Sequence, residues 1–396
     1  MSASERVGIG ARPFVSETVG ELPEIGVGML GYAFMGKAHS NAFLQVRQLA
    51  WPPPMQPRLV AIAGRDADMV ARAAVRYGYQ RSTTDWGDLV ADPAIGLFDN
   101  GGPNSVHAEP TIAAARAGKH VLCEKPLGRD ADESFAIWRD VDSTGVVHLC
   151  GFNYRFVPAL RLARDLIRAG EFGEIRHFRA RYLQDWGDDP ALDTWRFHAA
   201  DAGSGALGDL ASHAVDIGRF LVGEIASVSA LVKTFVPGRD VDDAVEAVVE
   251  FERGAVGTIE ATRLALGRRN ALQVEVNGSD GSFWFDLERL NELHLFRGDG
   301  DRARGARTVL VTEHDHPFIS YWWPPGSIIG WGDTFVHEVV HLLGAIAGAH
   351  GVGPDAATFE DGYRAAEVCD AMVRSSRSRR AEDVVYRRLA ATSRTS

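Results

Sequence analysis

The sequence is poor in cysteine. Its 396 residues include three cysteines, Cys123, Cys150 and Cys369. This odd and widely spaced set provides neither a disulfide framework nor the paired spacing of a metal site. We therefore expect a chain without a metal ion that works in the reducing environment of the cytoplasm.

Long apolar runs are also lacking. No stretch of about 18 consecutive apolar residues occurs, which excludes a membrane-spanning helix. Residues 1–20 lack the apolar core of a signal peptide, and we expect residues 1–22 to form a tail outside the fold.

Basic residues are outnumbered. Lys and Arg total 42 against 53 Asp and Glu, which gives a net charge of −11. Nucleic acids and anionic membranes are bound by basic faces, so we expect neither as a partner. The chain has 396 residues, of which 45% are hydrophobic. This length is more than a single hydrophobic core usually accommodates, so two domains are expected.

The first part of the chain alternates short apolar runs with helical patterns. Strands are predicted at residues 25–30, 59–63, 96–99, 120–123 and 146–150. Helices are predicted at residues 34–49, 67–77, 106–117 and 132–142, with a further helix ending at 89–92. Such alternation is typical of a parallel sheet with right-handed crossovers. We therefore predict a Rossmann dinucleotide-binding domain over residues 23–150.

The pattern changes after residue 150. A helix at 158–169 is followed by strand-like runs at 175–182, 228–235, 244–251, 255–262, 271–276, 282–285, 292–296 and 308–312. Helices at 334–348 and 359–376 close the chain. We predict that residues 151–396 form a substrate-binding α/β domain with a large, mostly antiparallel open sheet and helices on one face. Because the other face needs cover, we expect a homo-oligomer, either a dimer or a tetramer.

Two glycine patterns overlap at the first predicted strand. Residues 26–31 match G-x-G-x-x-G, but they lie within the strand. A dinucleotide fingerprint belongs at the turn between strand and helix. We therefore place the turn at Gly31 and read a G-x-A-x-x-G variant that ends at Gly36. Ala33 then lies where the backbone approaches the pyrophosphate, on the N-terminus of the following helix.

The end of the second strand bears on the choice between NAD and NADP. A carboxylate at this place binds the ribose 2′-hydroxyl of NAD. This chain has Gly64, Arg65 and Asp66. Arg65 could pair with the 2′-phosphate of NADP, or it could be a solvated surface arginine, and Asp66 stands one position late. These residues alone favour NADP.

Lys125 directly follows the predicted strand at 120–123. Parallel sheets bind their ligands at this end of the strands. A lysine there can hydrogen-bond a reacting hydroxyl and stabilise the developing alkoxide. The alternative is a surface lysine in a loop.

Asp209 and His213 lie four residues apart at the start of a predicted helix that ends before Gly223. This spacing places them on one face of the helix. Histidine suits proton transfer from an alcohol, and the carboxylate could orient the sugar or the base. The alternative is that Asp209 is an N-cap and His213 is a buried core histidine.

Three segments in fixed order carry a family resemblance: residues 123–126, 151–155 and 203–213. They resemble the glucose–fructose oxidoreductase, inositol dehydrogenase and rhizopine-catabolism (Gfo/Idh/MocA) family, over nearly the whole chain from Ile25 to about Asp370. The resemblance implies a Rossmann domain, an α/β domain with an open sheet, and catalytic roles for Lys125, Asp209 and His213.

Within the family, the chain is similar to sugar dehydrogenases that oxidise the 3-hydroxyl of a pyranose with NAD. This resemblance implies NAD as the cofactor, with NADP as the alternative that Arg65 suggests. Pro103, Asn104 and His107 match a family segment that lines the nicotinamide, although residues 100–102 depart from the family pattern before that proline.

The predicted site has two parts. Cofactor-binding residues are Gly31, Ala33, Phe34, Met35, Gly64, Arg65, Pro103, Asn104, His107, Glu124 and Lys125. Substrate-binding residues are Lys125, Asn153, Tyr154, Arg155, Gln184, Trp186, Asp209 and His213, with Trp195, Arg196, Arg263 and Trp331 as further candidates. Aromatic faces that pack on a sugar ring and polar groups that pair with hydroxyls suit a small-molecule sugar or polyol.

We therefore expect an NAD(P)-dependent dehydrogenase that takes a hydride from a ring-carbon hydroxyl of a pyranose, anhydrosugar or polyol. Two alternatives remain. One is a glycoside 3-oxidising enzyme that holds NAD tightly, and the other is a non-catalytic nucleotide-sensing protein on the same fold.

Overall fold

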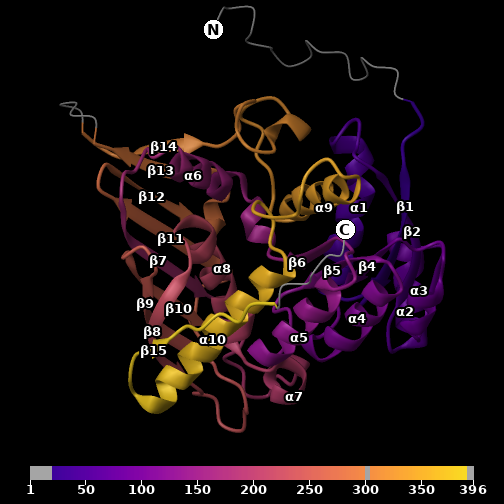
Figure 1. Cartoon of the computed structure of the whole chain (residues 1–396), viewed down its shortest axis with the longest axis horizontal. Helices are drawn as coiled ribbons and strands as arrows, with labels where there is room; N and C mark the ends of the chain where they lie inside the picture. The colour runs from indigo at the N-terminus through magenta and orange to yellow at the C-terminus, as the bar shows by residue number, and fades with distance from the viewer. Residues whose placement is uncertain (1–19, 299–303, 390–396) are drawn as a thin grey trace, which may run out of the picture.

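A computed structural model describes residues 20–298 and 304–389, which form two sheets and the helices around them (Figure 1). The predicted tail at 1–22 lies outside this range except for its last three residues. No helix in the described part of the chain is long and apolar enough to cross a membrane.

The first sheet is parallel and belongs to the N-terminal part of the chain. Its strands are β1 (Glu24–Leu30), β2 (Gln56–Ala63), β3 (Arg81–Thr83), β4 (Leu97–Asn100), β5 (His120–Glu124) and β6 (His148–Gly151). The helices between them are α1 (Phe34–Leu49), α2 (Ala67–Tyr77), α3 (Gly87–Ala91), α4 (Ala108–Arg116) and α5 (Ala131–Asp142).

The strand order β3-β2-β1-β4-β5-β6 is that of a Rossmann fold, as predicted. All pairs are parallel, and every residue of β1 after Glu24 is buried, as expected of a strand covered on both faces. The short edge strand β3 was not predicted, because three partly exposed residues carry no periodic signal. Lys125 therefore follows the fifth strand, not the fourth.

The C-terminal helices return to the first sheet. Helix α9 (Asp333–Ile346) packs against α1, and α10 (Phe359–Ser378) packs against α5 (Figure 1). Phe335, Val339 and Leu343 of α9 share one buried cluster with Val27 of β1 and Phe43 of α1. This part of the chain, which lies in the predicted second domain, thus contributes to the core of the Rossmann sheet.

The second sheet is mixed and large. Its strands are β7 (Ile175–Leu183), β8 (Ile225–Lys233), β9 (Ala244–Phe251), β10 (Val256–Thr262), β11 (Ala271–Gly278), β12 (Gly281–Asp286), β13 (Glu292–Arg297), β14 (Arg307–Leu310) and β15 (Glu382–Asp383). In the order β14-β13-β12-β11-β7-β10-β9-β8-β15, the described pairs are antiparallel except for β7 with β10. The predicted fold class, a Rossmann domain followed by an α/β domain with a large, mostly antiparallel sheet, is confirmed.

One face of the second sheet packs on helices and the other is open. Helices α6 (Pro158–Arg168), α8 (Ser212–Leu221) and α10 contact its strands, and Figure 1 shows α8 on the side toward the Rossmann domain. Along β9 the residues are alternately buried and exposed, which is the period of a strand with one covered face. Leu231, Val248, Val256 and Trp284 are among the exposed apolar residues.

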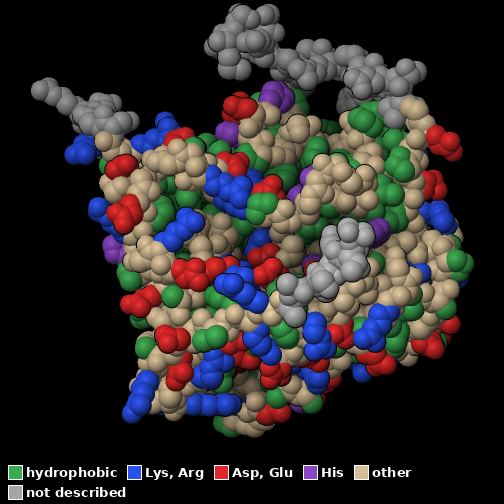
Figure 2. All heavy atoms as spheres, viewed as in Figure 1, with side chains coloured by type: hydrophobic (Ala, Val, Ile, Leu, Met, Phe, Trp, Pro, Cys, Tyr) green, Lys and Arg blue, Asp and Glu red, His purple; other side chains and the backbone are tan. Residues whose placement is uncertain are grey.

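The surface seen in Figure 2 mixes acidic and basic side chains. Red and blue groups alternate over this face of the molecule, and neither sign forms a continuous field there. This face therefore presents no single sign of charge that would attract a charged partner over a long range.

Candidate active site

One cavity of about 960 Å³ is lined by residues of both parts of the chain. From the Rossmann part, its walls include the predicted cofactor residues Gly31, Ala33, Phe34, Met35, Gly64, Arg65, Pro103, Asn104, Glu124 and Lys125. From the second part, they include Asn153, Tyr154, Gln184, Trp186, Trp195, Arg196, Asp209, His213, Arg263 and Trp331. A cavity at such a junction is where ligands are commonly bound.

The turn at Gly31 is built for close backbone approach. Gly31 has φ +105°, and a Cβ there would lie 2.7 Å from the carbonyl oxygen of Gly101. A Cβ on Gly36 would lie 2.2 Å from the carbonyl oxygen of Gly31. In contrast, Gly26 and Gly28 lie within β1, where added Cβ atoms would strike Ala94 and Ile95. These contacts support the reading of the fingerprint from Gly31 and explain the first two glycines by packing.

The N-terminus of α1 is free to receive an anion. It has no side-chain cap and no acidic residue in its first turn. Helices α2 and α5 differ, because Asp66 and Asp130 accept hydrogen bonds from their first turns. Uncapped amides and the positive end of the helix dipole suit a pyrophosphate, so the residues present fit a dinucleotide.

Arg65 and Asp66, which follow β2, have different surroundings. Asp66 Oδ1 accepts a hydrogen bond from the amide of Met69 at 2.9 Å, so this carboxylate is engaged as an N-cap. Arg65 lines the cavity and is exposed. An added Cβ on the neighbouring Gly64 would strike the ring of Tyr32, so this glycine makes room for that wall of the cavity.

Lys125 and Asp209 join the two parts of the site. Lys125 Nζ donates to Asp209 Oδ1 at 3.0 Å and to the Asp209 carbonyl oxygen at 2.8 Å. The lysine follows β5, and the aspartate lies on the π-helical turn η5 (Leu207–Ala211) that leads into α8. Such turns are frequent at functional sites. A third N–H of the ammonium group remains for a ligand oxygen.

Asp209 is held by a second cation. Arg263 Nη2 donates to Asp209 Oδ2 at 2.9 Å, and the arginine is almost fully buried. Burial opposes ionisation of Asp209, but Lys125 and Arg263 outweigh it and hold the pKa of the carboxyl well below its usual range. Both carboxylate oxygens are thus engaged by cations, and no hydrogen bond joins Asp209 to His213 among the described residues, so support of His213 by Asp209 stays a prediction.

His213 lies in the cavity wall as a neutral imidazole. Its ring packs against Tyr154, with ring centroids 4.5 Å apart. Its Nδ1 is buried and has no hydrogen-bond partner within the described residues, so a ligand in the cavity would have to reach Nε2. Burial and the Lys125 cation hold the pKa of His213 well below its usual range. A neutral imidazole can accept a proton.

A chain of hydrogen bonds runs along one wall of the cavity. Trp186 Nε1 donates to Gln184 Oε1 at 2.6 Å, and Gln184 Nε2 donates to Asn270 Oδ1 at 2.9 Å. Tyr182 donates to the same Asn270 oxygen at 2.7 Å, and its hydroxyl lies 2.8 Å from that of Tyr154. These bonds fix each group, so the wall offers polar atoms in set positions to a hydroxylated ligand.

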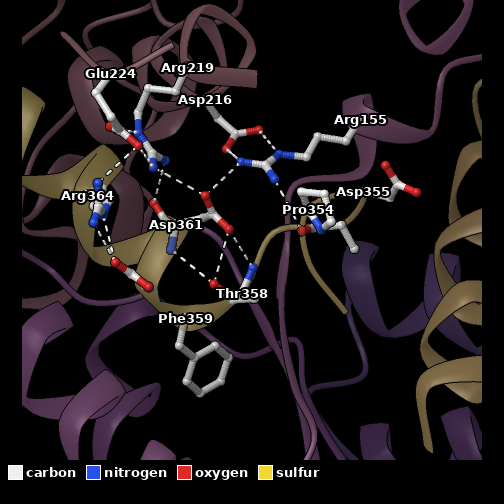
Figure 3. A network of polar contacts seen from close by, with 12 residues as sticks. Arg155, Asp216, Arg219, Glu224, Pro354, Asp355, Thr358, Phe359, Asp361 and Arg364 are labelled. Atoms are coloured by element: carbon white, nitrogen blue, oxygen red, sulfur yellow. Dashed lines mark hydrogen bonds and ion pairs between the residues drawn. The ribbon is translucent and has the colours of Figure 1, made fainter. Parts of the chain in front are cut away.

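Two predicted site residues do not line the cavity. His107 is fully buried, and its ring nitrogens lie 2.9 and 3.1 Å from the carbonyl oxygens of Pro126 and Gly102, so it holds the two loops together. Arg155 forms a bidentate pair with Asp216 at 2.6 and 2.9 Å and a further ion pair with Asp361 at 3.1 Å (Figure 3). The predicted substrate contact of Arg155 is therefore corrected, because buried carboxylates engage its guanidinium away from the cavity.

Other lining residues were not predicted. Tyr32, Trp86, Tyr182, Arg269, Asn270 and Phe335 face the cavity. Asn270 arrives just before β11, whose pairing with β7 is set by strand register. No local sequence signal marks that register, whereas Tyr32 could have been found as a large side chain beside the predicted turn at Gly31.

The fold and this cavity define a dinucleotide-dependent oxidoreductase. The model of the oxidoreductase family with an NAD-binding Rossmann fold matches residues 25–152, and that of the GFO/IDH/MocA C-terminal domain matches residues 160–284. A levoglucosan dehydrogenase of Pseudarthrobacter phenanthrenivorans is 41% identical over 381 residues, covering 90% of this chain and 97% of that protein. The chain belongs to the Gfo/Idh/MocA family, so the predicted membership and the NAD-binding domain are confirmed.

Solved structures of dehydrogenases are also similar to this chain. Levoglucosan dehydrogenase in complex with NADH and levoglucosan aligns with a TM-score of 0.88 at 43% identity, covering 91% of this chain and 99% of that chain. An oxidoreductase domain protein from Kribbella flavida aligns with a TM-score of 0.88 at 42% identity, covering 92% and 100%. The scyllo-inositol 2-dehydrogenase of Bacillus subtilis is 30% identical over 287 residues, covering 70% of this chain and 76% of that protein. Sugar and polyol dehydrogenases are thus among the relatives.

Proposed function

We propose that this protein oxidises a secondary ring hydroxyl of a pyranose, an anhydrosugar or a polyol, with levoglucosan and its 3-hydroxyl as the first candidates. The observation that carries the proposal is the convergence of Lys125, Asp209 and His213 on one cavity beside the glycine turn. Relatives named for sugars and inositols support the substrate class.

In the proposed reaction, His213 accepts the proton and Lys125 stabilises the negative charge. The substrate hydroxyl loses its proton to Nε2 of His213, which the low pKa keeps in the accepting form. Lys125 donates its remaining N–H to the same oxygen and stabilises the alkoxide. NAD⁺ held by the Gly31 turn and the N-terminus of α1 would supply the hydride acceptor that the oxidation of the ring carbon to a ketone needs. Asp209 and Arg263 keep the lysine in place for this contact.

The cavity wall supports a neutral, hydroxylated substrate. Gln184, Asn270 and Tyr154 present fixed polar atoms, while Trp186 and Trp331 present aromatic surface. Pyranose rings combine apolar C–H faces with hydroxyl edges, so this pairing of surfaces suits them.

The test is to measure NADH formation by absorbance with levoglucosan, glucose, myo-inositol and a glycoside, with NAD or NADP supplied. We expect the highest kcat/KM with levoglucosan and NAD, and a 3-keto product by NMR. A protein purified with NAD that turns over without added cofactor would favour the glycoside 3-oxidising alternative. Cofactor binding without oxidation of any member of the panel would favour a nucleotide sensor.

A further inference from the structure

A buried ion cluster lies next to Lys125, and its central histidine lies outside the cavity. His39 of α1 is fully buried, and its Nδ1 lies 3.0 Å from both carboxylate oxygens of Asp99 in β4. Its Nε2 lies 3.1 Å from Oε1 of Glu124, the last residue of β5. His39 does not line the cavity, whereas Glu124 does. One imidazole thus connects the dinucleotide helix with the ends of two central strands.

The partners of His39 determine its charge. Ionised carboxylates only accept hydrogen bonds, so an imidazole between two of them is satisfied when both ring nitrogens carry a proton. Burial disfavours the cation, but Asp99 and Glu124 outweigh it and raise the pKa of His39 well above its usual range. Burial also raises the pKa of Asp99, which the His39 cation opposes. Other titratable groups near the cluster include Glu338 of α9, Tyr79 and Cys123, whose pKa values burial raises, and His107, whose pKa burial lowers.

Glu124 also contacts the backbone of the catalytic lysine, Lys125. Its second oxygen, Oε2, accepts a hydrogen bond from the backbone amide of Lys125 at 3.3 Å. Gly151 in the neighbouring strand leaves space for the carboxylate, because a Cβ there would lie 2.5 Å from Oε1 of Glu124. The carboxylate therefore has its two oxygens fixed by His39 on one side and by the Lys125 amide on the other.

We propose that His39 is a positioning residue: as an imidazolium held between Asp99 and Glu124, it fixes the Glu124 carboxylate and through it the backbone of Lys125. This inference rests on the proposed function only for the effect on turnover. The clamp is complete at neutral pH and is lost as pH rises through the raised pKa of His39. No substrate or cofactor atom needs to touch His39.

The test compares His39→Gln with His337→Gln. His337 is an equally buried histidine, on α9, whose nitrogens contact the carbonyl oxygen of Phe156 and the indole of Trp322 rather than a carboxylate. His39→Gln should shift the Lys125 backbone amide in ¹H–¹⁵N spectra, assigned with Lys125→Met, and should lower kcat about tenfold with little change in NADH affinity. His337→Gln should lower thermal stability without either effect.

A second experiment combines His39→Gln with Glu124→Gln. Two facing amides can pair, so His39→Gln/Glu124→Gln should regain part of the kcat that either single variant loses. An unshifted Lys125 amide in His39→Gln, additive losses in the double variant, or an equal loss in His337→Gln would overturn the proposal. The amide measurement needs no sugar, so it decides the positioning role even where the proposed oxidation fails.

Discussion

Lys125 Nζ binds Asp209 through two oxygens, the side-chain Oδ1 at 3.0 Å and the backbone carbonyl at 2.8 Å. The lysine directly follows strand β5 of the Rossmann sheet, and the aspartate lies on the turn η5 that leads into the helix carrying His213. This contact therefore brings together the cofactor part and the substrate part of the site. Lys125 and Asp209 are only partly exposed. The hydrogen bonds from Nζ to the side-chain and backbone oxygens of Asp209 fix the geometry of the pair, in addition to the attraction between the two charges.

Replacing Lys125 by Met should lower kcat by a factor on the order of 10² or more, as for loss of an acid–base or charge-stabilising group. Binding of NADH, followed by fluorescence, should stay nearly unchanged. Lys37→Met, which removes an exposed lysine of α1, serves as the control. A fully active Lys125→Met enzyme would remove the lysine from the mechanism.

Arg65 is predicted to decide how the protein handles NADP. Because Asp66 caps α2, Arg65 is the charged group of this segment that is free to meet a 2′-phosphate. Arg65→Ala should weaken NADP binding by roughly tenfold and spare NAD, measured by titration with each reduced cofactor. Arg72→Ala, on the exposed side of α2, is the control. Equal effects on the two cofactors would mean that Arg65 is merely solvated.

The pH dependence of kcat/KM should reflect the protonation of His213. Since burial and the Lys125 cation hold the pKa of His213 well below its usual range, the imidazole stays neutral through that range, and kcat/KM should fall only at a pH below it. His213→Ala should lower kcat by about 10² or more and abolish this acid limb, with modest change in NADH affinity. If the variant keeps the wild-type profile, another group accepts the proton.

The open face of the second sheet should mediate self-association. Leu231, Val248, Val256 and Trp284 are 44%, 54%, 40% and 39% exposed there. Val248→Glu should therefore reduce the oligomer mass measured by light scattering at micromolar concentration. Val75→Glu, at an 86% exposed position of α2, should leave it unchanged. A wild-type monomer would contradict the prediction.

Sequence reasoning succeeded where the signal is local. The turn at Gly31 and the position of Lys125 follow from a buried strand and the residues directly after it. It failed where distant segments meet. The role of Arg155 depends on Asp216 and Asp361, the latter on a helix about two hundred residues away, as Figure 3 shows. Asn270 likewise reaches the cavity through the pairing of β11 with β7, two strands that are far apart in the chain.

The most direct test of the proposed function is the fate of the hydrogen on C3. Levoglucosan labelled with deuterium at C3 is incubated with the enzyme and NAD, and the reduced cofactor is examined by mass spectrometry and NMR. Hydride transfer from C3 predicts deuterium on the nicotinamide ring, a 3-keto sugar in equal amount, and a slower rate than with unlabelled sugar. Reduced cofactor without deuterium, or no reduced cofactor at all, would contradict it.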